Sequence, residues 1–275
     1  MMKRGYFGED RFLSNKSGQV AVFIIIAILV VGLAILFYFL KPGITSTTQF
    51  EETNPNAFIQ SCIKEDIENA IEVVSLQGGS INPENFILYK SNRVEYLCYT
   101  TEFYKTCVVQ QPLLKQHIES EVEDEIREEV DGCFEELKKS YEDRGYNVNL
   151  EEGSAEDVIR VELLPKRIVT SFSYVLTASK GETKRYDSFN VILNNNLYEL
   201  VAISDSIIDW ESEFGDADSG FYMSIYPDLK VEKFNQQDGS TVYVLTDRNN
   251  NKIFQFASRS LAWPPGVSIG GVATN

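Results

Sequence analysis

The sequence predicts an α+β protein, with an N-terminal transmembrane helix and an exterior domain of two long amphipathic helices packed on an antiparallel β-sheet. Residues 20–40 carry no charge, residues 55–77 and 112–141 place apolar side chains at helical spacing, and the period becomes strand-like beyond Gly145. We divide the chain into a cytoplasmic basic segment (1–18), a transmembrane helix (19–41), a linker (42–54), the exterior domain (55–262) and a tail (263–275) expected to be disordered.

The apolar run at residues 20–40 is long enough to cross a lipid bilayer, which takes about 20 helical residues. Basic residues flank it unevenly, because four precede it and, after Lys41, the next is Lys64. Lys and Arg are retained on the cytoplasmic side, so residues 1–18 are expected inside and 42–275 outside. The run is too long for a cleaved secretory signal, so we expect the helix to remain as a membrane anchor.

The segment Lys16-Ser17-Gly18-Gln19, directly before the apolar run, resembles the class III signal peptide of archaeal pilins and archaellins. The resemblance implies cleavage on the cytoplasmic side, between Gly18 and Gln19. The chain departs from the pattern at the fifth mature position, where assembled pilins usually carry Glu and this chain has Phe23. A buried carboxylate there would pair with the amino terminus of a neighbouring subunit, so Phe23 argues against a filament.

A wider set of features resembles a group of uncharacterised archaeal single-pass membrane proteins. The features are Gly-Gln-Val-x-x-Phe-Ile-Ile before the span, Cys62 on a helix, Leu76-Gln77-Gly78-Gly79, an acidic helix ending near Cys133, a strand-rich second half and Phe254-Gln255-Phe256-Ala257. The resemblance implies an architecture and carries no activity.

The helices of the exterior domain follow from caps and apolar spacing. The 42–54 linker is rich in Thr and Ser, and Asn54-Pro55 then predicts an N-cap with Pro at the first helical position. Apolar residues recur every three or four positions until Gly78-Gly79 stops the helix. A second helix is predicted from Pro112 to about Tyr141. One apolar face runs along it, and acidic residues cover its other faces. That apolar face comprises Leu114, Ile118, Val122, Ile126, Val130, Cys133, Leu137 and Tyr141.

The second half of the domain reads as short strands separated by turns. Residues 81–90 before it are expected to be extended or irregular, and 196–210 helical. Segments rich in β-branched and aromatic residues predict strands, and their close spacing predicts antiparallel hairpins. These segments are 158–164, 167–178, 189–193, 231–234, 241–246 and 253–256.

All four cysteines lie in the predicted exterior domain, where disulfides persist. Cys98 and Cys107 fall in two short strands around a turn at 100–104, which would bring them opposite each other. Cys62 and Cys133 fall on the apolar faces of two helices. We therefore pair Cys98 with Cys107 and Cys62 with Cys133. A zinc site is the rival hypothesis, but the chain has no C-x-x-C pair and only one His, so we expect no metal.

The search for catalytic chemistry returns no established motif. There is no G-x-S-x-G, P-loop, G-x-G-x-x-G or H-E-x-x-H pattern. His117 is interpreted as an ordinary helix-surface histidine. Residues 216–220 and 247–251 alternate oxygen-bearing side chains, but neither continues as a calcium loop, so both are interpreted as turns. Paired carboxylates for glycoside hydrolysis stay open as a hypothesis, whereas Trp210 and Trp263 alone do not predict a sugar-stacking platform.

The net charge and the absence of catalytic motifs limit the classes of function that the sequence allows. The chain has 25 basic and 41 acidic residues, of which 20 and 39 lie beyond residue 41, a net charge of about −19 there. Such a surface repels phosphate backbones, so no nucleic-acid partner is expected. A solvated acidic surface is the favoured reading over cation association or a basic partner. We expect a membrane-anchored structural or interaction protein with a partner on the cell surface or envelope, no cofactor and no catalysis. The alternatives are a pilin-like subunit and an unrecognised exterior enzyme.

Overall fold

The computed structural model describes residues 29–32, 54–153 and 157–262. Met1–Glu51 and Glu52–Asn275 are two separate compact units, and the fold below is that of the second. Gly18, Gln19, the 263–275 tail and most of the predicted span lie outside the described residues; within the span, residues 29–32 are helical. No helix in the described ranges has the length and apolar character that crossing a membrane requires.

Helix α2 (Pro55–Leu76) begins and ends where its sequence predicts. The Asn54 side chain accepts hydrogen bonds from the backbone N–H groups of Asn56 and Ala57, and Pro55 occupies the first turn. At the other end, Gly78 and Gly79 have positive φ, and the Gly79 N–H donates to the Val74 carbonyl at 2.8 Å. One face of α2 is buried along its whole length, so the helix belongs to the core.

The second helix is interrupted, so the prediction of one continuous helix from Pro112 to Tyr141 was wrong. Helix α3 (Leu114–Glu125) ends at Ile126, whose φ of −90° and ψ of 0° are outside the helical range, and α4 (Arg127–Glu142) follows at once. The apolar face continues through the break, because Val122, Ile126 and Val130 are all buried. Helix α3 packs on β5 (Ile159–Leu164) and on α2, and α4 packs on α2 as well.

The strands form three sheets, with antiparallel pairing everywhere except at one junction. The mixed α+β class with antiparallel sheets is therefore confirmed, while the expectation of a single sheet was wrong. The remaining strands are β1 (Phe86–Tyr89), β2 (Asn92–Tyr99), β3 (Val108–Val109), β4 (Asn147–Glu152), β6 (Arg167–Phe172), β7 (Tyr174–Lys180), β8 (Glu182–Tyr186), β9 (Phe189–Asn194), β10 (Leu229–Asn235), β11 (Thr241–Asp247) and β12 (Ile253–Arg259).

The largest sheet has the strand order β1-β2-β12-β11-β10, and β3 pairs with β2. The exception to antiparallel pairing is β2 with β12, which run parallel and bring Tyr96 beside Ala257 and Cys98 beside Ser258. Their register shifts between Ala257 and Ser258. This junction joins the predicted cysteine hairpin to the C-terminal hairpins in one sheet.

Two three-stranded sheets, β4-β7-β8 and β5-β6-β9, make up the rest. The predicted strand 167–178 breaks at Ser173, and its halves, β6 and β7, belong to different sheets. On either side of the break, Phe172 and Tyr174 are both buried against Phe134 of α4, whose ring stacks on Tyr174 with centroids 3.9 Å apart. The aromatic cluster ties these two sheets to the helical layer.

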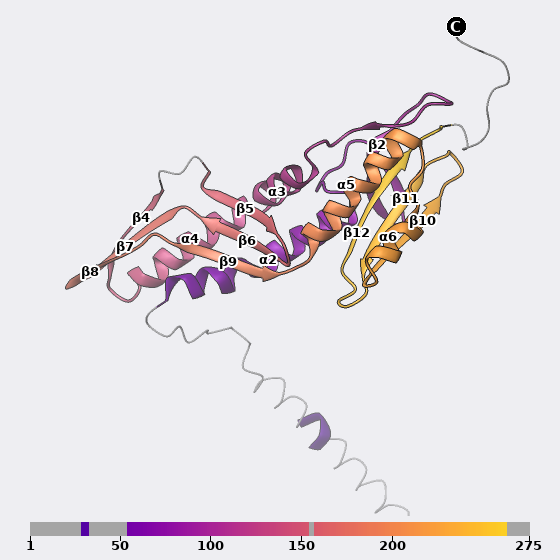
Figure 1. Ribbon diagram of the computed structural model, residues 1–275. Coiled ribbons are helices and arrows are strands. Elements are labelled where there is room, and N and C mark those ends of the chain that lie inside the picture. Colours follow the sequence, from indigo (N-terminus) through magenta and orange to yellow (C-terminus); the bar gives the residue numbers. More distant parts are fainter. Residues whose placement is uncertain (1–28, 33–53, 154–156, 263–275) are drawn as a thin grey trace, which may run out of the picture. The chain divides into compact units, whose positions relative to one another are not determined.

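Helix α5 (Leu197–Phe214) extends the predicted 196–210 helix by four residues and packs on β11 and β12. It ends at Gly215, which has a φ of 85°. The short helix α6 (Ser219–Ile225), whose first two residues fall in the predicted 216–220 turn, packs on β10. Figure 1 shows α2 and α4 alongside the strands β4 to β9, and α5 and α6 alongside β10 to β12.

Two disulfide bonds join Cys62 to Cys133 and Cys98 to Cys107, the same pairs that the sequence predicts. The first links α2 to α4, with Cα atoms 6.0 Å apart. The second links the end of β2 to the residue before β3, with Cα atoms 5.3 Å apart, and is buried. Each bond therefore joins neighbouring elements of the same compact unit.

Candidate functional site

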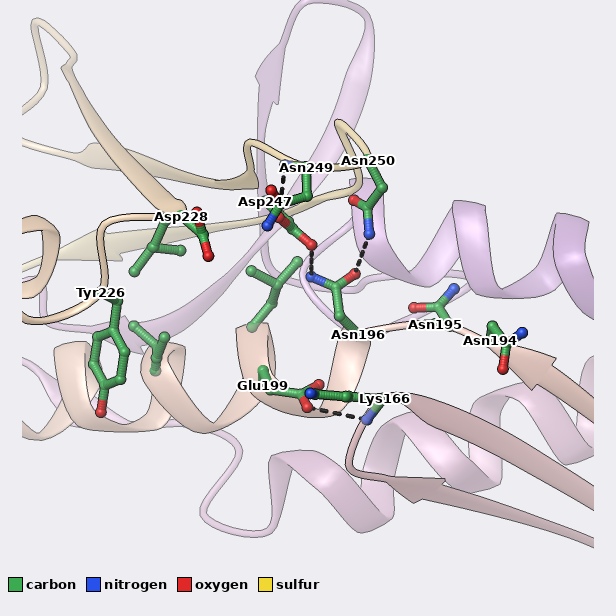
Figure 2. A pocket seen from close by; sticks show the side chains of 13 residues that line it. Lys166, Asn194, Asn195, Asn196, Glu199, Tyr226, Asp228, Asp247, Asn249 and Asn250 are labelled. Atoms are coloured by element: carbon green, nitrogen blue, oxygen red, sulfur yellow. Dashed lines mark hydrogen bonds between the residues drawn. The ribbon is translucent and has the colours of Figure 1, made fainter.

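A cavity of about 400 Å³ opens where the ends of the β5-β6-β9 sheet and of the largest sheet meet helix α5. Its volume lies within the range of about 300–1,000 Å³ typical of ligand pockets. Figure 2 shows Asn196 near the centre of the site, with Asp247 and Asn250 above it and Glu199 and Lys166 below. Tyr226 and Asp228 lie to the left in this view, and Asn194 and Asn195 to the right. The thirteen lining residues are Lys166, Asn194, Asn195, Asn196, Glu199, Leu200, Ile203, Tyr226, Asp228, Leu229, Asp247, Asn249 and Asn250.

Turns rather than strand interiors supply most of the polar groups. Lys166 lies in the two-residue β5–β6 turn with a φ of 61°, and its carbonyl accepts a hydrogen bond from the Asn195 N–H at 3.2 Å. Across the cavity, the β11–β12 turn closes with a hydrogen bond from the Asn251 N–H to the Asp247 carbonyl at 2.8 Å. Short hydrogen-bonded turns therefore position these polar groups at the cavity wall.

The carboxylate of Asp247 organises one side of the cavity. Its Oδ1 accepts from the Asn249 N–H at 2.9 Å, and its Oδ2 accepts from Asn196 Nδ2 at 2.9 Å. Asn250 Nδ2 donates in turn to Asn196 Oδ1 at 3.4 Å (Figure 2). Residues 247–251 thus form the turn that the sequence predicts, with both Asp247 oxygens engaged within the protein.

The other acidic turn, 216–220, also directs its carboxylates to the protein itself. Asp216 pairs with Lys233, and the Asp218 side chain accepts from the Gly220 N–H at 2.8 Å at the start of α6. Among the residues that the structure describes, no group of three or more His, Cys, Asp and Glu side chains is arranged to hold a metal ion. Neither turn therefore offers a cage of free carboxylates.

Glu199 on α5 has one oxygen that is satisfied and one that is not. Its Oε1 accepts from the Lys166 N–H at 3.0 Å, whereas Oε2 is buried with no hydrogen-bond partner within the described residues. An unpaired buried carboxylate oxygen costs about 1–3 kcal/mol or more. A donor group on a ligand in the cavity would remove this cost.

Two further cavities follow the first in sequence, each sharing lining residues with the one before it. One of about 310 Å³ shares Asn195, Leu200 and Asn250 with it. A third, of about 570 Å³ along α2, shares Glu68, Glu72 and Lys252 with the second. The three cavities together are called the asparagine groove below.

The asparagine groove carries net negative charge, because six carboxylates line it with three lysines. The lysines are Lys64, Lys166 and Lys252, and the carboxylates are Glu65, Glu68, Glu72, Glu199, Asp228 and Asp247. Anionic ligands are disfavoured there, since like charges repel across a groove of low dielectric constant.

His117 does not lie free on a helix surface, so that interpretation was wrong. Its Nε2 is 2.7 Å from the hydroxyl oxygen of buried Ser80, and that hydroxyl donates to Glu95. Burial raises the pKa of the Glu95 carboxyl, and the Ser80 hydrogen bond partly offsets the rise. A Ser-His-acid nucleophile needs histidine to accept the serine proton. Here the Ser80 hydroxyl donates its hydrogen bond to Glu95, so the arrangement is not that of a catalytic triad. The three side chains instead satisfy one another's polar groups inside the domain.

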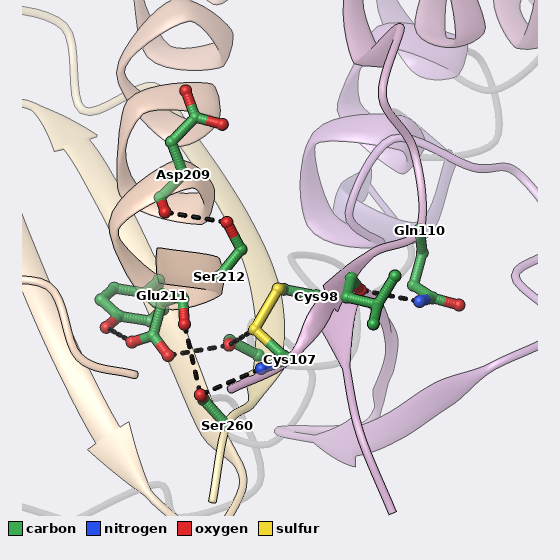
Figure 3. The surroundings of a disulfide bond; sticks show 10 residues. Cys98, Cys107, Gln110, Asp209, Glu211, Ser212 and Ser260 are labelled. Atoms are coloured by element: carbon green, nitrogen blue, oxygen red, sulfur yellow. Dashed lines mark hydrogen bonds between the residues drawn. A yellow bond between two sulfur atoms is a disulfide. The ribbon is translucent and has the colours of Figure 1, made fainter. Parts of the chain in front are cut away.

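A second buried carboxylate, Glu211 on α5, lies beside the Cys98–Cys107 disulfide (Figure 3). It accepts hydrogen bonds from Tyr243 and, at 3.0 Å, from Ser258. Burial raises the pKa of Glu211, and these two donors partly offset the rise. Both carboxylate oxygens therefore accept a hydrogen bond within the protein, and Glu211 anchors α5 to β11 and β12.

Part of the groove was predictable from the sequence. Residues 247–251 were predicted as a turn with oxygen-bearing side chains, whereas no prediction included Asn194, Asn195, Asn196 or Tyr226 as site residues. Asn194 to Asn196 read as a break before a helix, and nothing in the sequence places them beside the β11–β12 turn. Trp210 lies on α5 outside the groove, and Trp263 is outside the described residues.

Comparison with protein-family models, with curated proteins and with solved structures gives no match for this chain. The candidate site therefore rests on geometry and chemistry alone.

Proposed function

We propose that this chain is a membrane-anchored interaction protein of the cell exterior, and that it contacts a surface component through the asparagine groove. Residues 1–18 lie in the cytoplasm, 19–41 cross the lipid bilayer, and the Glu52–Asn275 unit works outside. The observation that carries the proposal is the groove itself, a chain of three adjoining cavities lined by amides and carboxylates together with apolar side chains such as Leu200, Ile203 and Leu229.

The paired cysteines support the exterior location. All four cysteines of the chain form disulfides, and none is free. Disulfides form and persist in oxidising compartments and are rare in the cytosol. The positive charge before the apolar run supports the same orientation.

The lining of the groove favours binding over catalysis. Five of the thirteen residues around the first cavity are asparagines, whose amides donate and accept hydrogen bonds but do not exchange protons near neutral pH. General acid–base catalysis needs a titratable group aimed at the reacting atom. Two of the carboxylates there, Glu199 and Asp247, accept hydrogen bonds from the protein. The proposed role therefore involves no chemical step.

Photo-crosslinking on intact cells tests this proposal. Benzoylphenylalanine in place of exposed Asn249 is expected to capture a component of the cell surface or envelope. The same residue in place of Asn147, an exposed position on β4 outside the groove, is the matched control. Products that form equally from both positions, or from neither, would contradict a contact through the groove.

Processing between Gly18 and Gln19 is a second proposal, carried by Lys16-Ser17-Gly18-Gln19 directly before the apolar run. It would place the chain among pilin-like subunits. Mass spectrometry of the mature N-terminus decides it: a chain that starts at Gln19 supports processing, whereas an intact Met1 or Met2 leaves a simple anchor.

A further inference from the structure

We propose that the asparagine groove binds a neutral, linear oligosaccharide. This inference rests on the proposed function, because it names the chemical class of the partner that the groove contacts. The features of the groove that carry it are amides without a hydrogen-bond partner among the described residues, an aromatic ring at the rim, a net negative charge and an elongated shape.

The amides match the chemistry of sugar hydroxyls. A hydroxyl both donates and accepts a hydrogen bond, and an asparagine amide offers one acceptor and two donors. The side chains of Asn194 and Asn249 line the first cavity and make no hydrogen bond to any described residue. The unpaired Oε2 of Glu199 adds a pure acceptor on the wall of the same cavity. A ligand with several adjacent hydroxyls satisfies all three groups at once.

Tyr226 supplies the apolar contact that a sugar ring needs. It follows α6, its side chain is 49% exposed, and it borders the first cavity next to Asp228 (Figure 2). The C–H face of a pyranose ring is apolar and packs on an aromatic face, while its hydroxyls point outward to polar partners. Asp228 lines the same cavity, and its carboxylate accepts no hydrogen bond from any described residue, so it can accept from such a hydroxyl.

The charge and length of the groove narrow the class further. Six carboxylates against three lysines disfavour phosphorylated, sulfated or uronic-acid chains. Three cavities joined through shared walls suit several consecutive sugar units better than one. The ligand is therefore neutral and linear.

A peptide fits the groove less well. Extended peptides commonly bind by adding a strand to a free sheet edge. Lining residues here come from turns and from the sides of α2 and α5, and no strand contributes a run of its edge. The groove thus lacks the backbone ladder on which that mode depends.

Calorimetry on the full chain in lipid nanodiscs tests the inference. The probes are linear hexasaccharides of glucose, mannose and N-acetylglucosamine, the corresponding monosaccharides, hexagalacturonate and a neutral Gly/Asn hexapeptide. At least one neutral hexasaccharide is expected to bind more than about tenfold tighter than its monosaccharide, which occupies one cavity only. Hexagalacturonate and the peptide are expected to bind at least tenfold more weakly.

Matched variants assign the binding to the groove. Asn249→Ala is expected to weaken binding about fivefold, from the loss of one net hydrogen bond, and Tyr226→Ala about tenfold. The controls Asn147→Ala on β4 and Phe103→Ala, whose ring is 72% exposed outside the groove, are expected to change binding less than twofold. Equal losses in groove and control variants would overturn the assignment.

The outcomes separate this inference from the proposed function. Binding by none of the neutral hexasaccharides, or tighter binding of the peptide or hexagalacturonate, overturns the inference. The crosslink from position 249 to a surface protein would in that case still support an interaction role. Cleavage of a bound hexasaccharide, seen as shorter products by mass spectrometry, would instead contradict the absence of catalysis.

Discussion

Removal of the Cys62–Cys133 bond by Cys62→Ala/Cys133→Ala is expected to lower the free energy of unfolding of the Glu52–Asn275 unit by about 4 kcal/mol. The two cysteines are 71 residues apart, and closing a loop of that length in the unfolded chain costs about this much in the chain-entropy model. The Cys98–Cys107 bond closes only 9 residues, so Cys98→Ala/Cys107→Ala should cost about 2.5 kcal/mol.

Urea denaturation of the full chain in detergent, followed by circular dichroism, gives both values. Each single substitution at Cys62 or Cys133 should cost about as much as the double one, because either removes the same cross-link. Adding a reductant should destabilise the wild-type protein by about the sum of both bonds, and the Cys62→Ala/Cys133→Ala variant by the shorter bond only.

The reasoning fails if the two pairs cost the same, or if the nine-residue bond costs more. It also fails if a single substitution costs much less than the double one, since this would show that the partner thiol is not left unpaired. Peptide mapping without reductant gives an independent check, because Cys62 should appear linked to Cys133 and to no other cysteine.

Three further substitutions test the packing and electrostatics. Burial and the Asp209 charge raise the pKa of Asp205 to about 6, so the stability of the wild-type protein falls as pH rises from about 4 to 6. In urea titrations, Asp205→Asn should raise the free energy of unfolding by about 1–2 kcal/mol at pH 7 and leave it unchanged near pH 4. Lys166 has a positive φ, so Lys166→Gly should raise the free energy of unfolding by about 1 kcal/mol. No increase would show that the turn is unstrained. Phe134→Ala, in the aromatic cluster, should cost about 3–5 kcal/mol, and a loss under 1 kcal/mol would refute its core role.

Local signals predicted most elements of the domain. The Asn54-Pro55 start of α2 and its Gly78-Gly79 end appear where the sequence places them. The predicted strands 158–164, 189–193, 231–234, 241–246 and 253–256 match β5, β9, β10, β11 and β12, whereas β4 and β8 were not predicted. Capping, glycine conformation and strand patterning act within a few residues, so they are readable without tertiary contacts.

The breaks in long elements were not predictable in the same way. The apolar face of the acidic helix runs unbroken across Ile126, because α3 and α4 bury the same stripe on both sides of that residue. The strand pattern likewise continues across Ser173, where Phe172 and Tyr174 are both buried. Periodicity reports which face is buried, and the packing partners decide where the backbone turns.

Long-range contacts explain what remained unseen. The parallel pairing of β2 with β12 joins segments more than 150 residues apart, and no turn signal announces it. The same holds for His117 against Ser80, and for Asn196 against Asp247 in the groove. Asparagines are common in turns for several structural reasons. Only the fold therefore shows that the five asparagines of the first cavity lie around the same space.

Labelling of one added cysteine on intact cells tests most directly that the domain works outside the membrane. Lys184 on β8 is exposed, and its side chain forms no hydrogen bond or ion pair with any described residue, so Lys184→Cys presents a free thiol, whereas the paired cysteines of the wild type give no label. A membrane-impermeant maleimide should label Lys184→Cys before lysis to the same extent as after it. Labelling that appears only after lysis would place the domain in the cytoplasm and contradict the account.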